Sequence, residues 1–444
     1  MHPKIFVDGF YGLYHENGGV ASMIVRFGRE LAEVNVGKIN TCKDSPTLRA
    51  KGHEKSFTRD RKLTAERVVS MIIEPAKQSL RARLHDFGDK YMSGEYATKQ
   101  AFSKRRQFVN PDFIREFYDE NAEKLINEAE LITYKGMHLT GVDGTRIACE
   151  NTPELIAEFG CSGSKKDACT ALASAAYDLI ERVSFDCQIG SYSLSERDLL
   201  DRHLDRLEAF GPENFLIVAD RGYPSYDLIE TLIDRKFNFL LRLSEGWSNV
   251  ISWLHDTADK ELQYDNKGYG YKFRALRIEL EDKNEYLITN LDEATISLDE
   301  AKRIYSLRWG IETYYGVLKT ELELENFSGK TKNAVLQEFY AALTIANICQ
   351  CFINDADIEI SARDMHKDLK YKRQANRRHC IGEIVPVFLE CVFTDSDRKR
   401  NRLWKKVERF CAESPEPIRP GRNPARKKPR DKKFYANARK PRLS

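Results

Sequence analysis

The chain has no CxxC motif and no long hydrophobic run. None of its ten cysteines forms a CxxC pair, which favours free thiols in a reducing compartment over disulfides or structural zinc. The most apolar stretch, 341–353, is interrupted by polar residues and is shorter than the ~20 residues of a membrane span. The first residues also lack the apolar core of a secretory signal. We therefore expect a cytoplasmic protein with no membrane partner.

The chain as a whole also lacks a large excess of one charge, although its C-terminal segment does not. The formal net charge is only +3, but residues 419–444 hold eleven Lys and Arg against one Asp, which is +10. The remaining 418 residues carry −7. Arg426, Lys427 and Lys428 form the densest part of this basic tail. Such an asymmetry indicates a polyanionic partner, and nucleic acid is the obvious candidate.

With 444 residues, of which 41% are hydrophobic, the chain is long enough for several globular domains. Strand-like segments alternate with helical ones from Met137 onward, which predicts a mixed α/β sheet with helices on its faces. The segment before it is helical and carries the basic stretches SFTRDRK and SKRRQ, typical of either DNA binding or protein interaction. The predicted divisions are an N-terminal helical, DNA-binding domain (1–110), a first part of the α/β core (111–243), a β-rich insertion (244–298), a second part of the core (299–353), a C-terminal helical region (354–418) and the basic tail (419–444).

Local signals predict where several helices begin. Asn110–Pro111 combines an N-cap residue with proline in the first turn. Two capping boxes are expected, Ser193 with Glu196 and Ser297 with Glu300. The second should open one long helix that continues to about Leu322.

Two aspartates lie where apolar strands are expected to end. Asp143 follows MHLTGV in a predicted strand–turn–strand, and Asp220 follows the fully apolar run FLIVA. The ends of strands are where α/β sheets present functional side chains. An aspartate at such a position can also do no more than start a turn, and each residue alone allows that interpretation.

The helix after residue 297 carries a third candidate carboxylate. Tyr305, Arg308, Glu312 and Lys319 fall within about 60° of one another on an α-helix, beside the apolar stripe of the same helix. The alternative is an ordinary Arg308–Glu312 pair on a solvated face. Two aspartates and one glutamate form a set of hard oxygen ligands suited to Mg²⁺ or Mn²⁺, and such a set can hold two ions for in-line displacement at phosphorus.

At these residues the chain resembles the DDE transposases of bacterial insertion sequences. The subgroup with a Tyr-x2-Arg-x3-Glu-x6-Lys motif is matched without a gap by Tyr305, Arg308, Glu312 and Lys319. The motifs around the two aspartates are GVDGTRI and VADRGYPSYDLI. The resemblance implies an RNase H-like catalytic core with a β-rich insertion between the second Asp and the Glu.

The resemblance also implies roles. Asp143, Asp220 and Glu312 would bind two Mg²⁺ ions, for which Mn²⁺ would substitute. Tyr305, Arg308 and Lys319 would contact the DNA backbone beside the scissile bond. Arg221 is a further candidate DNA contact, although a buried ion pair explains it equally well. Trp247 and Trp253 in the insertion fit core packing, with stacking on a flipped base as the alternative.

The sequence thus predicts a DNA transposase that acts as a homodimer on double-stranded DNA, cutting the terminal inverted repeats of an insertion sequence and joining them to target DNA in the bacterial nucleoid. The alternative is a catalytically inactive transposase derivative that binds DNA as a regulator. A haloacid-dehalogenase-type phosphatase is disfavoured because Gly141 stands where its nucleophilic Asp would be. The stretch GCSGSK lacks the spacing of a P-loop.

Overall fold

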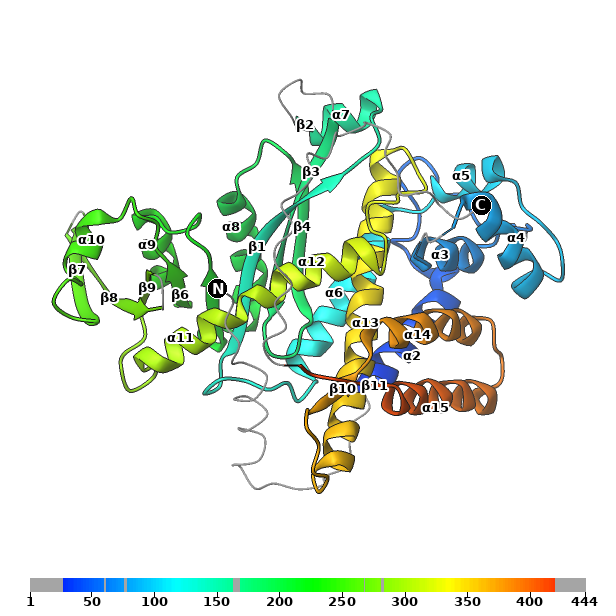
Figure 1. Cartoon of the computed structure of the whole chain (residues 1–444). Coiled ribbons are helices and arrows are strands. Elements are labelled where there is room, and N and C mark those ends of the chain that lie inside the picture. Colours follow the sequence, from blue (N-terminus) through cyan, green and yellow to red (C-terminus); the bar gives the residue numbers. More distant parts are fainter. Residues whose placement is uncertain are drawn as a thin grey trace.

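The computed structural model describes residues 27–419, except 60, 76–77, 163–167, 267 and 281–282. A twisted sheet and its covering helices form the middle of the molecule, with a helical assembly on one side and the strands of the predicted insertion on the other (Figure 1). Arg426, Lys427 and Lys428, with nearly all of the basic tail, lie outside the described residues.

The helices of the described chain are α2 (Phe27–Asn40), η1 (Cys42–Asp44), α3 (Ala65–Ile73), α4 (Leu80–Tyr91), α5 (Lys99–Arg106), α6 (Pro111–Asn127), α7 (Pro153–Phe159), α8 (Glu196–Leu207), η2 (Glu208–Phe210), η3 (Pro212–Asn214), α9 (Tyr226–Asp234), α10 (Ser248–Ser252), α11 (Leu298–Leu307), α12 (Trp309–Thr320), α13 (Lys332–Asp364), α14 (Arg377–Val392) and α15 (Asp397–Glu413). The start of α6 confirms the Asn110–Pro111 signal, because the Asn110 side chain accepts the Asp112 N–H. Among these helices, none combines the length and hydropathy that crossing a bilayer requires.

The strands are β1 (His138–Ala148), β2 (Cys161–Ser162), β3 (Ala168–Asp178), β4 (Ser184–Ser191), β5 (Phe215–Ala219), β6 (Asn238–Arg242), β7 (Asp259–Asn266), β8 (Tyr269–Glu279), β9 (Asn284–Thr289), β10 (Arg373–Ala375) and β11 (Pro415–Pro417). In the main sheet β4, β3 and β1 are antiparallel neighbours, and β5 and β6 continue it parallel to β1. This arrangement confirms the predicted mixed α/β sheet with helices on its faces.

The strands of the predicted insertion extend the main sheet. β9 pairs antiparallel with β6, and β8 and then β7 follow. The order across the described sheet is therefore β2-β3-β1-β5-β6-β9-β8-β7, with β4 also paired to β3. The β-rich character predicted for 244–298 is present, and α10 precedes its strands. The domain boundaries themselves remain a prediction.

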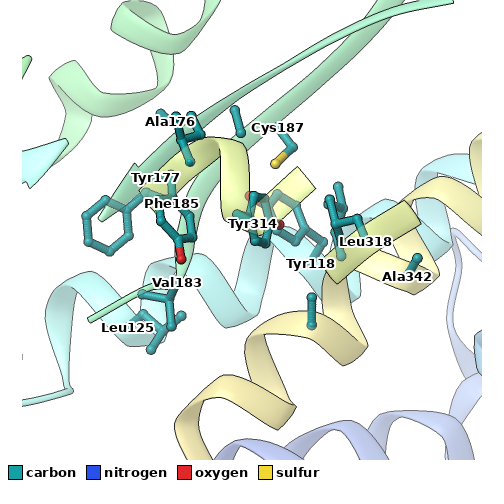
Figure 2. Close-up of a cluster of buried hydrophobic side chains, with 14 of the residues drawn as sticks. Tyr118, Leu125, Ala176, Tyr177, Val183, Phe185, Cys187, Tyr314, Leu318 and Ala342 are labelled. Carbon is teal, nitrogen blue, oxygen red and sulfur yellow. The ribbon is translucent and has the colours of Figure 1, made fainter. Parts of the chain in front are cut away.

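Helices cover both faces of the sheet. Alternate residues of a strand point to opposite faces, and in β3 Ser174 lies on the α8 side while Tyr177 stacks on Tyr314 of α12. Figure 2 shows the core on the α12 side, where Tyr118 of α6, Tyr314 and Leu318 of α12 and the sheet residues Tyr177 and Cys187 meet. This packing holds α12 directly against the strand that carries Asp143.

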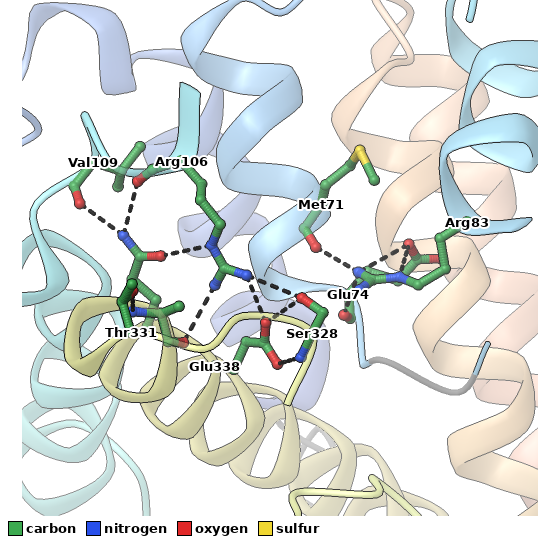
Figure 3. Close-up of polar contacts among 10 residues, drawn as sticks. Met71, Glu74, Arg83, Arg106, Val109, Ser328, Thr331 and Glu338 are labelled. Atoms are coloured by element: carbon green, nitrogen blue, oxygen red, sulfur yellow. Dashed lines mark hydrogen bonds and ion pairs between the residues drawn. The ribbon is translucent and has the colours of Figure 1, made fainter. Parts of the chain in front are cut away.

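The helical assembly is organised around α13, which packs against α2, α3, α6, α14 and α15. Arg106, at the end of α5, is buried against it: its guanidinium donates to Gln337 Oε1 at 3.0 Å, Ser328 Oγ at 2.9 Å and Glu338 Oε1 at 2.7 Å (Figure 3). Arg105 bonds the carbonyl of Leu63. Both arginines of SKRRQ therefore make contacts within the helical assembly and are not displayed on a free basic face.

Candidate active site

The register of the sheet brings the two aspartates together. β1 and β5 run parallel with Val142 opposite Ala219, so Asp143 and Asp220 are the next residues on neighbouring strands. β5 consists entirely of buried apolar residues, which fixes its position in the core. The predicted juxtaposition of these two carboxylates therefore has a simple cause in strand pairing.

The expected turn at Asp143 is wrong. β1 continues without a break to Ala148, and Asp143 lies opposite Ala175 of β3. Gly144 faces the α8 side, where a Cβ atom would lie 2.6 Å from Oε1 of Glu196. A side chain at this position would have to displace the Glu196 carboxylate, so Gly144 marks a close approach of that side chain and not a turn.

The helix that follows the insertion divides at Arg308. The Ser297–Glu300 capping box is confirmed at the start of α11, but the single long helix expected from it consists of α11 and α12, with Arg308 as the joint cap. At this junction Arg308 N–H donates to the Tyr305 carbonyl at 3.1 Å, three residues back, a tightened turn between the two segments.

The Arg308 side chain lies between two of the carboxylates. Its Nη1 is 3.6 Å from Asp143 Oδ2, and its Nη2 donates to Glu312 Oε1 at 2.9 Å. Only 9% of Arg308 is exposed. The Arg308–Glu312 pair is present, but it does not lie on a fully solvated face: Arg308 is buried and shared with Asp143, whereas 34% of the Glu312 side chain is exposed.

Asp220 has its own partners. The Tyr305 hydroxyl donates to Asp220 Oδ1 at 2.9 Å, and Arg242 Nη1 of β6 lies 3.5 Å from the same oxygen. Tyr305 is itself buried, with 9% exposed. Burial alone would raise the pKa of Asp220, but the Arg221 backbone N–H and the Arg308 guanidinium hold this pKa below its ordinary value.

Asp143 is perturbed in the opposite direction. Burial, with smaller contributions from the carboxylates of Glu196 and Glu312, raises its pKa to about 6 against the lowering effects of Arg308 and of the Gly144 N–H. The neighbouring cation does not fully offset the effect of burial on this carboxyl. An added positive charge would bring its pKa back down.

Lys319 lies further along the same edge of α12. Its ammonium donates to Thr145 Oγ1 at 2.9 Å and to the carbonyl of Arg146, and it is 3.4 Å from Glu325. Lys319 therefore ties α12 to β1 just beyond Asp143, and it contacts none of the three candidate carboxylates. The structure groups Tyr305, Arg308 and Glu312 with the aspartates and sets Lys319 beside them.

Residues 135–348 match a protein-family model described as Transposase DDE domain. This part of the chain is therefore similar to a transposase DDE domain. Among solved structures, the chain is similar to the piggyBac transposase in a synaptic complex with hairpin DNA, with 10% sequence identity, a TM-score of 0.44, and coverage of 86% of this chain and 82% of that one. No curated protein matches the chain.

Asp143, Asp220 and Glu312 are chemically suitable ligands for a divalent cation. Carboxylate oxygens are the ligands that Mg²⁺ and Mn²⁺ prefer, and the high pKa of Asp143 fits a place designed for added positive charge. In the described ranges, however, no three acidic, His or Cys side chains converge closely enough to hold a metal ion. The group that lies between Asp143 and Glu312 is the guanidinium of Arg308.

Sequence reasoning missed Glu196 and Arg242. Glu196 was expected in a capping box with Ser193, but the box at the start of α8 is Ser195 with Asp198. This leaves the Glu196 carboxylate to lie over Gly144, with Oε2 3.9 Å from the Cβ position of Gly222. The overlapping S-x-x-E and S-x-x-D patterns were the available signal for Glu196, whereas Arg242 had none.

Buried polar groups support β1 from the α8 side. Ser174 Oγ donates to the Asp143 carbonyl at 3.0 Å, and His203 Nε2 lies 2.9 Å from the same hydroxyl. His203 Nδ1 is in turn 2.6 Å from Asp186 Oδ2. On the other side, Tyr315 donates to the Asp143 carbonyl at 2.6 Å. The backbone that carries Asp143 is thus held from both faces.

The remaining candidates are less engaged. Arg221 is exposed, so a buried ion pair does not account for it. Trp247 packs on Tyr226 with ring centroids 4.8 Å apart, as the packing interpretation expects. Trp253 is 47% exposed, so core packing does not describe it.

Proposed function

We propose that the chain is a DNA transposase that cuts and joins double-stranded DNA at the inverted-repeat ends of a bacterial insertion sequence. The observation that carries this proposal is the proximity of Asp143, Asp220 and Glu312: Arg308 pairs with Asp143 and Glu312 and acts electrostatically on Asp220. All three residues lie in the part of the chain that matches the transposase DDE domain family. Such a protein would work on the nucleoid, as a homodimer that synapses two ends before joining them to target DNA.

Asp143, Asp220 and Glu312 are the proposed ligands of two Mg²⁺ ions, which Mn²⁺ would replace. When bound, such ions activate the attacking oxygen and stabilise the leaving one. The chain's own groups hold this arrangement: strand pairing fixes the two aspartates, Tyr305 orients Asp220, and the packing of α12 fixes Glu312.

The cationic side chains are the proposed DNA contacts. Arg308 and Lys319 lie beside the carboxylates, where a scissile phosphate would be placed, and exposed Arg221 follows Asp220 directly. Arg426, Lys427 and Lys428 of the tail would add contacts to phosphates that carry no sequence information.

The experiment is incubation of the purified protein with Mg²⁺ and a duplex carrying the repeats that flank its own gene. Wild-type protein should nick the repeat ends, and Glu312→Gln should bind the duplex without cutting it. Glu321→Gln is the matched control: it removes the same charge at the end of α12, where Glu321 pairs with exposed Arg378 at 3.5 Å. An inactive regulator would bind the repeats and leave them intact in all three proteins.

A further inference from the structure

The carboxylates of this site are partly compensated by cations and hydrogen-bond donors of the chain itself. Arg308 faces Asp143 and Glu312, while Arg242 and the Tyr305 hydroxyl face Asp220. An unpaired buried carboxylate is costly, so a cation between Asp143 and Glu312 stabilises the protein in the absence of any other positive charge. The guanidinium supplies that cation.

A guanidinium and a divalent ion compete for the space between Asp143 and Glu312, because both would occupy it and their positive charges repel each other. Mg²⁺ requires oxygen ligands at about 2.0–2.1 Å in near-octahedral order. Arg308 Nη2 already lies 2.9 Å from Glu312 Oε1, and Nη1 faces Asp143 Oδ2. The Arg308 guanidinium would therefore have to move away before divalent ions could bind between these two carboxylates.

DNA offers the guanidinium an alternative partner. The planar fork of arginine matches phosphate oxygens in pairs, and these charge-assisted hydrogen bonds are among the strong ones. A phosphate brought to the carboxylates by DNA would compete for Arg308 and leave Asp143 and Glu312 in need of another cation. Lys319 cannot play this part, because it is bound to Thr145 and Arg146 of β1.

We propose that Arg308 is an exchangeable counter-ion: it pairs with Asp143 and Glu312 in the DNA-free protein and moves to a DNA phosphate when the substrate binds, so that divalent ions and DNA enter the site together. The proposal rests on the proposed function, since it assumes that these carboxylates bind the ions. Binding of DNA and binding of metal then strengthen each other by the same factor. The DNA-free protein would then bind metal weakly, so the metal-loaded site would form only when the DNA substrate is bound.

The test is a titration of the DNA-free, full-length protein with Mn²⁺, followed by electron paramagnetic resonance of the unbound ion. Arg308→Gln should bind Mn²⁺ about tenfold more tightly than wild type, within the range usual for coupled sites. Arg303→Gln removes the same charge from an exposed position of α11 and should leave the Mn²⁺ affinity unchanged. Arg308→Lys, which keeps the charge with little change in size, should stay close to wild type.

A second titration adds a duplex that ends at the repeat terminus and so has no bond to cut. This duplex should tighten Mn²⁺ binding by wild type and have little effect on Arg308→Gln. The proposal is overturned if Arg308→Gln binds Mn²⁺ no more tightly than wild type without DNA, or if Arg308→Lys binds it as tightly as Arg308→Gln. Because both titrations measure metal and not cleavage, the predicted affinities would support Arg308 as the counter-ion even if the repeats were never cut.

Discussion

Asp143 and Asp220 are neighbours on parallel strands, yet their carboxyls are perturbed in opposite directions. Burial dominates at Asp143 and raises its pKa to about 6, whereas the Arg221 N–H and Arg308 outweigh burial at Asp220 and lower its pKa. Asp143 therefore destabilises the folded chain when ionised, and Asp220 stabilises it. If both residues bind metal ions, as proposed, this difference in pKa belongs to the metal-free protein.

Replacing Asp143 by Asn should stabilise the protein at pH 7.5. The folded pKa lies above the unfolded value near 4, so the folded state binds more protons between about pH 4 and 6 and its unfolding free energy falls as pH rises through that window. Asp143→Asn should gain on the order of 2 kcal/mol at pH 7.5 in urea unfolding, and the gain should vanish near pH 4. Asp220→Asn should instead lose stability at pH 7.5, and equal responses of the two variants would contradict the account.

Glu196→Gln should shift the pH dependence of cleavage. Glu196 is one of the charges that raise the pKa of Asp143, so removing it lets Asp143 ionise at lower pH. The acid limb of the rate profile should move to lower pH. Asp198→Asn, on the same helix, should leave the limb where it is, because Asp198 is exposed and is not among the charges that act on Asp143.

The residues of the site were predictable to the extent that they sit in local patterns. Asp143, Asp220 and Glu312 stand in motifs that can be read along the chain. Glu196 and Arg242 reach the site only through tertiary packing, from 53 and 99 positions after Asp143 in the numbering. No local pattern specifies which residue of a distant strand will face a given carboxylate.

At the scale of single elements, helix boundaries followed capping chemistry where one candidate was present and failed where two overlapped. The Ser297–Glu300 capping box is present as expected. The stretch SLSERD, however, contains two possible capping boxes that start two residues apart. In the structure Asp198 caps α8, which places Glu196 beside β1. A shift of two residues in a helix start thus changed which carboxylate faces the site.

Within α12, Glu312→Ala and Lys319→Ala should fail in different ways. Glu312→Ala should lose cleavage while DNA binding holds, because it removes a proposed metal ligand and a negative charge. Lys319→Ala should lose about 1 kcal/mol of stability with its hydrogen bonds to β1, slow cleavage, and lower the salt slope of DNA binding by about 1. Gel-shift and nicking assays on one duplex separate the two, and full cleavage by Glu312→Ala would refute the DDE assignment.

At the scale of the whole molecule, the class of fold was predictable and the reach of the sheet was not. Alternating strands and helices indicated an α/β core, whereas period-two segments in 244–298 gave no sign that β9 would pair with β6 and carry the sheet onward. The basic stretch SKRRQ was similarly ambiguous, since Arg106 is buried against α13. Composition identifies charged residues, but only packing decides which remain available for DNA.

Removing residues 419–444 should weaken DNA binding without changing the chemistry. Each phosphate neutralised by the tail contributes about 0.9 to the log–log slope of affinity against salt. With eleven cations in this segment, the slope should fall by several units, as measured by fluorescence anisotropy between 50 and 200 mM salt. An unchanged slope would show that the tail does not contact DNA.

The central claim, that Asp143 binds a catalytic metal ion, is tested most directly by exchanging its oxygen ligand for sulfur. Asp143→Cys should be inactive on the repeat duplex in Mg²⁺, which disfavours thiolate, and should regain cleavage in Mn²⁺, which accepts it more readily. Asp143→Ala should remain inactive in both ions, as it supplies no ligand. If Asp143→Cys cuts in Mg²⁺ at the wild-type rate, or stays as inactive in Mn²⁺ as Asp143→Ala, the assignment of Asp143 as a metal ligand is contradicted.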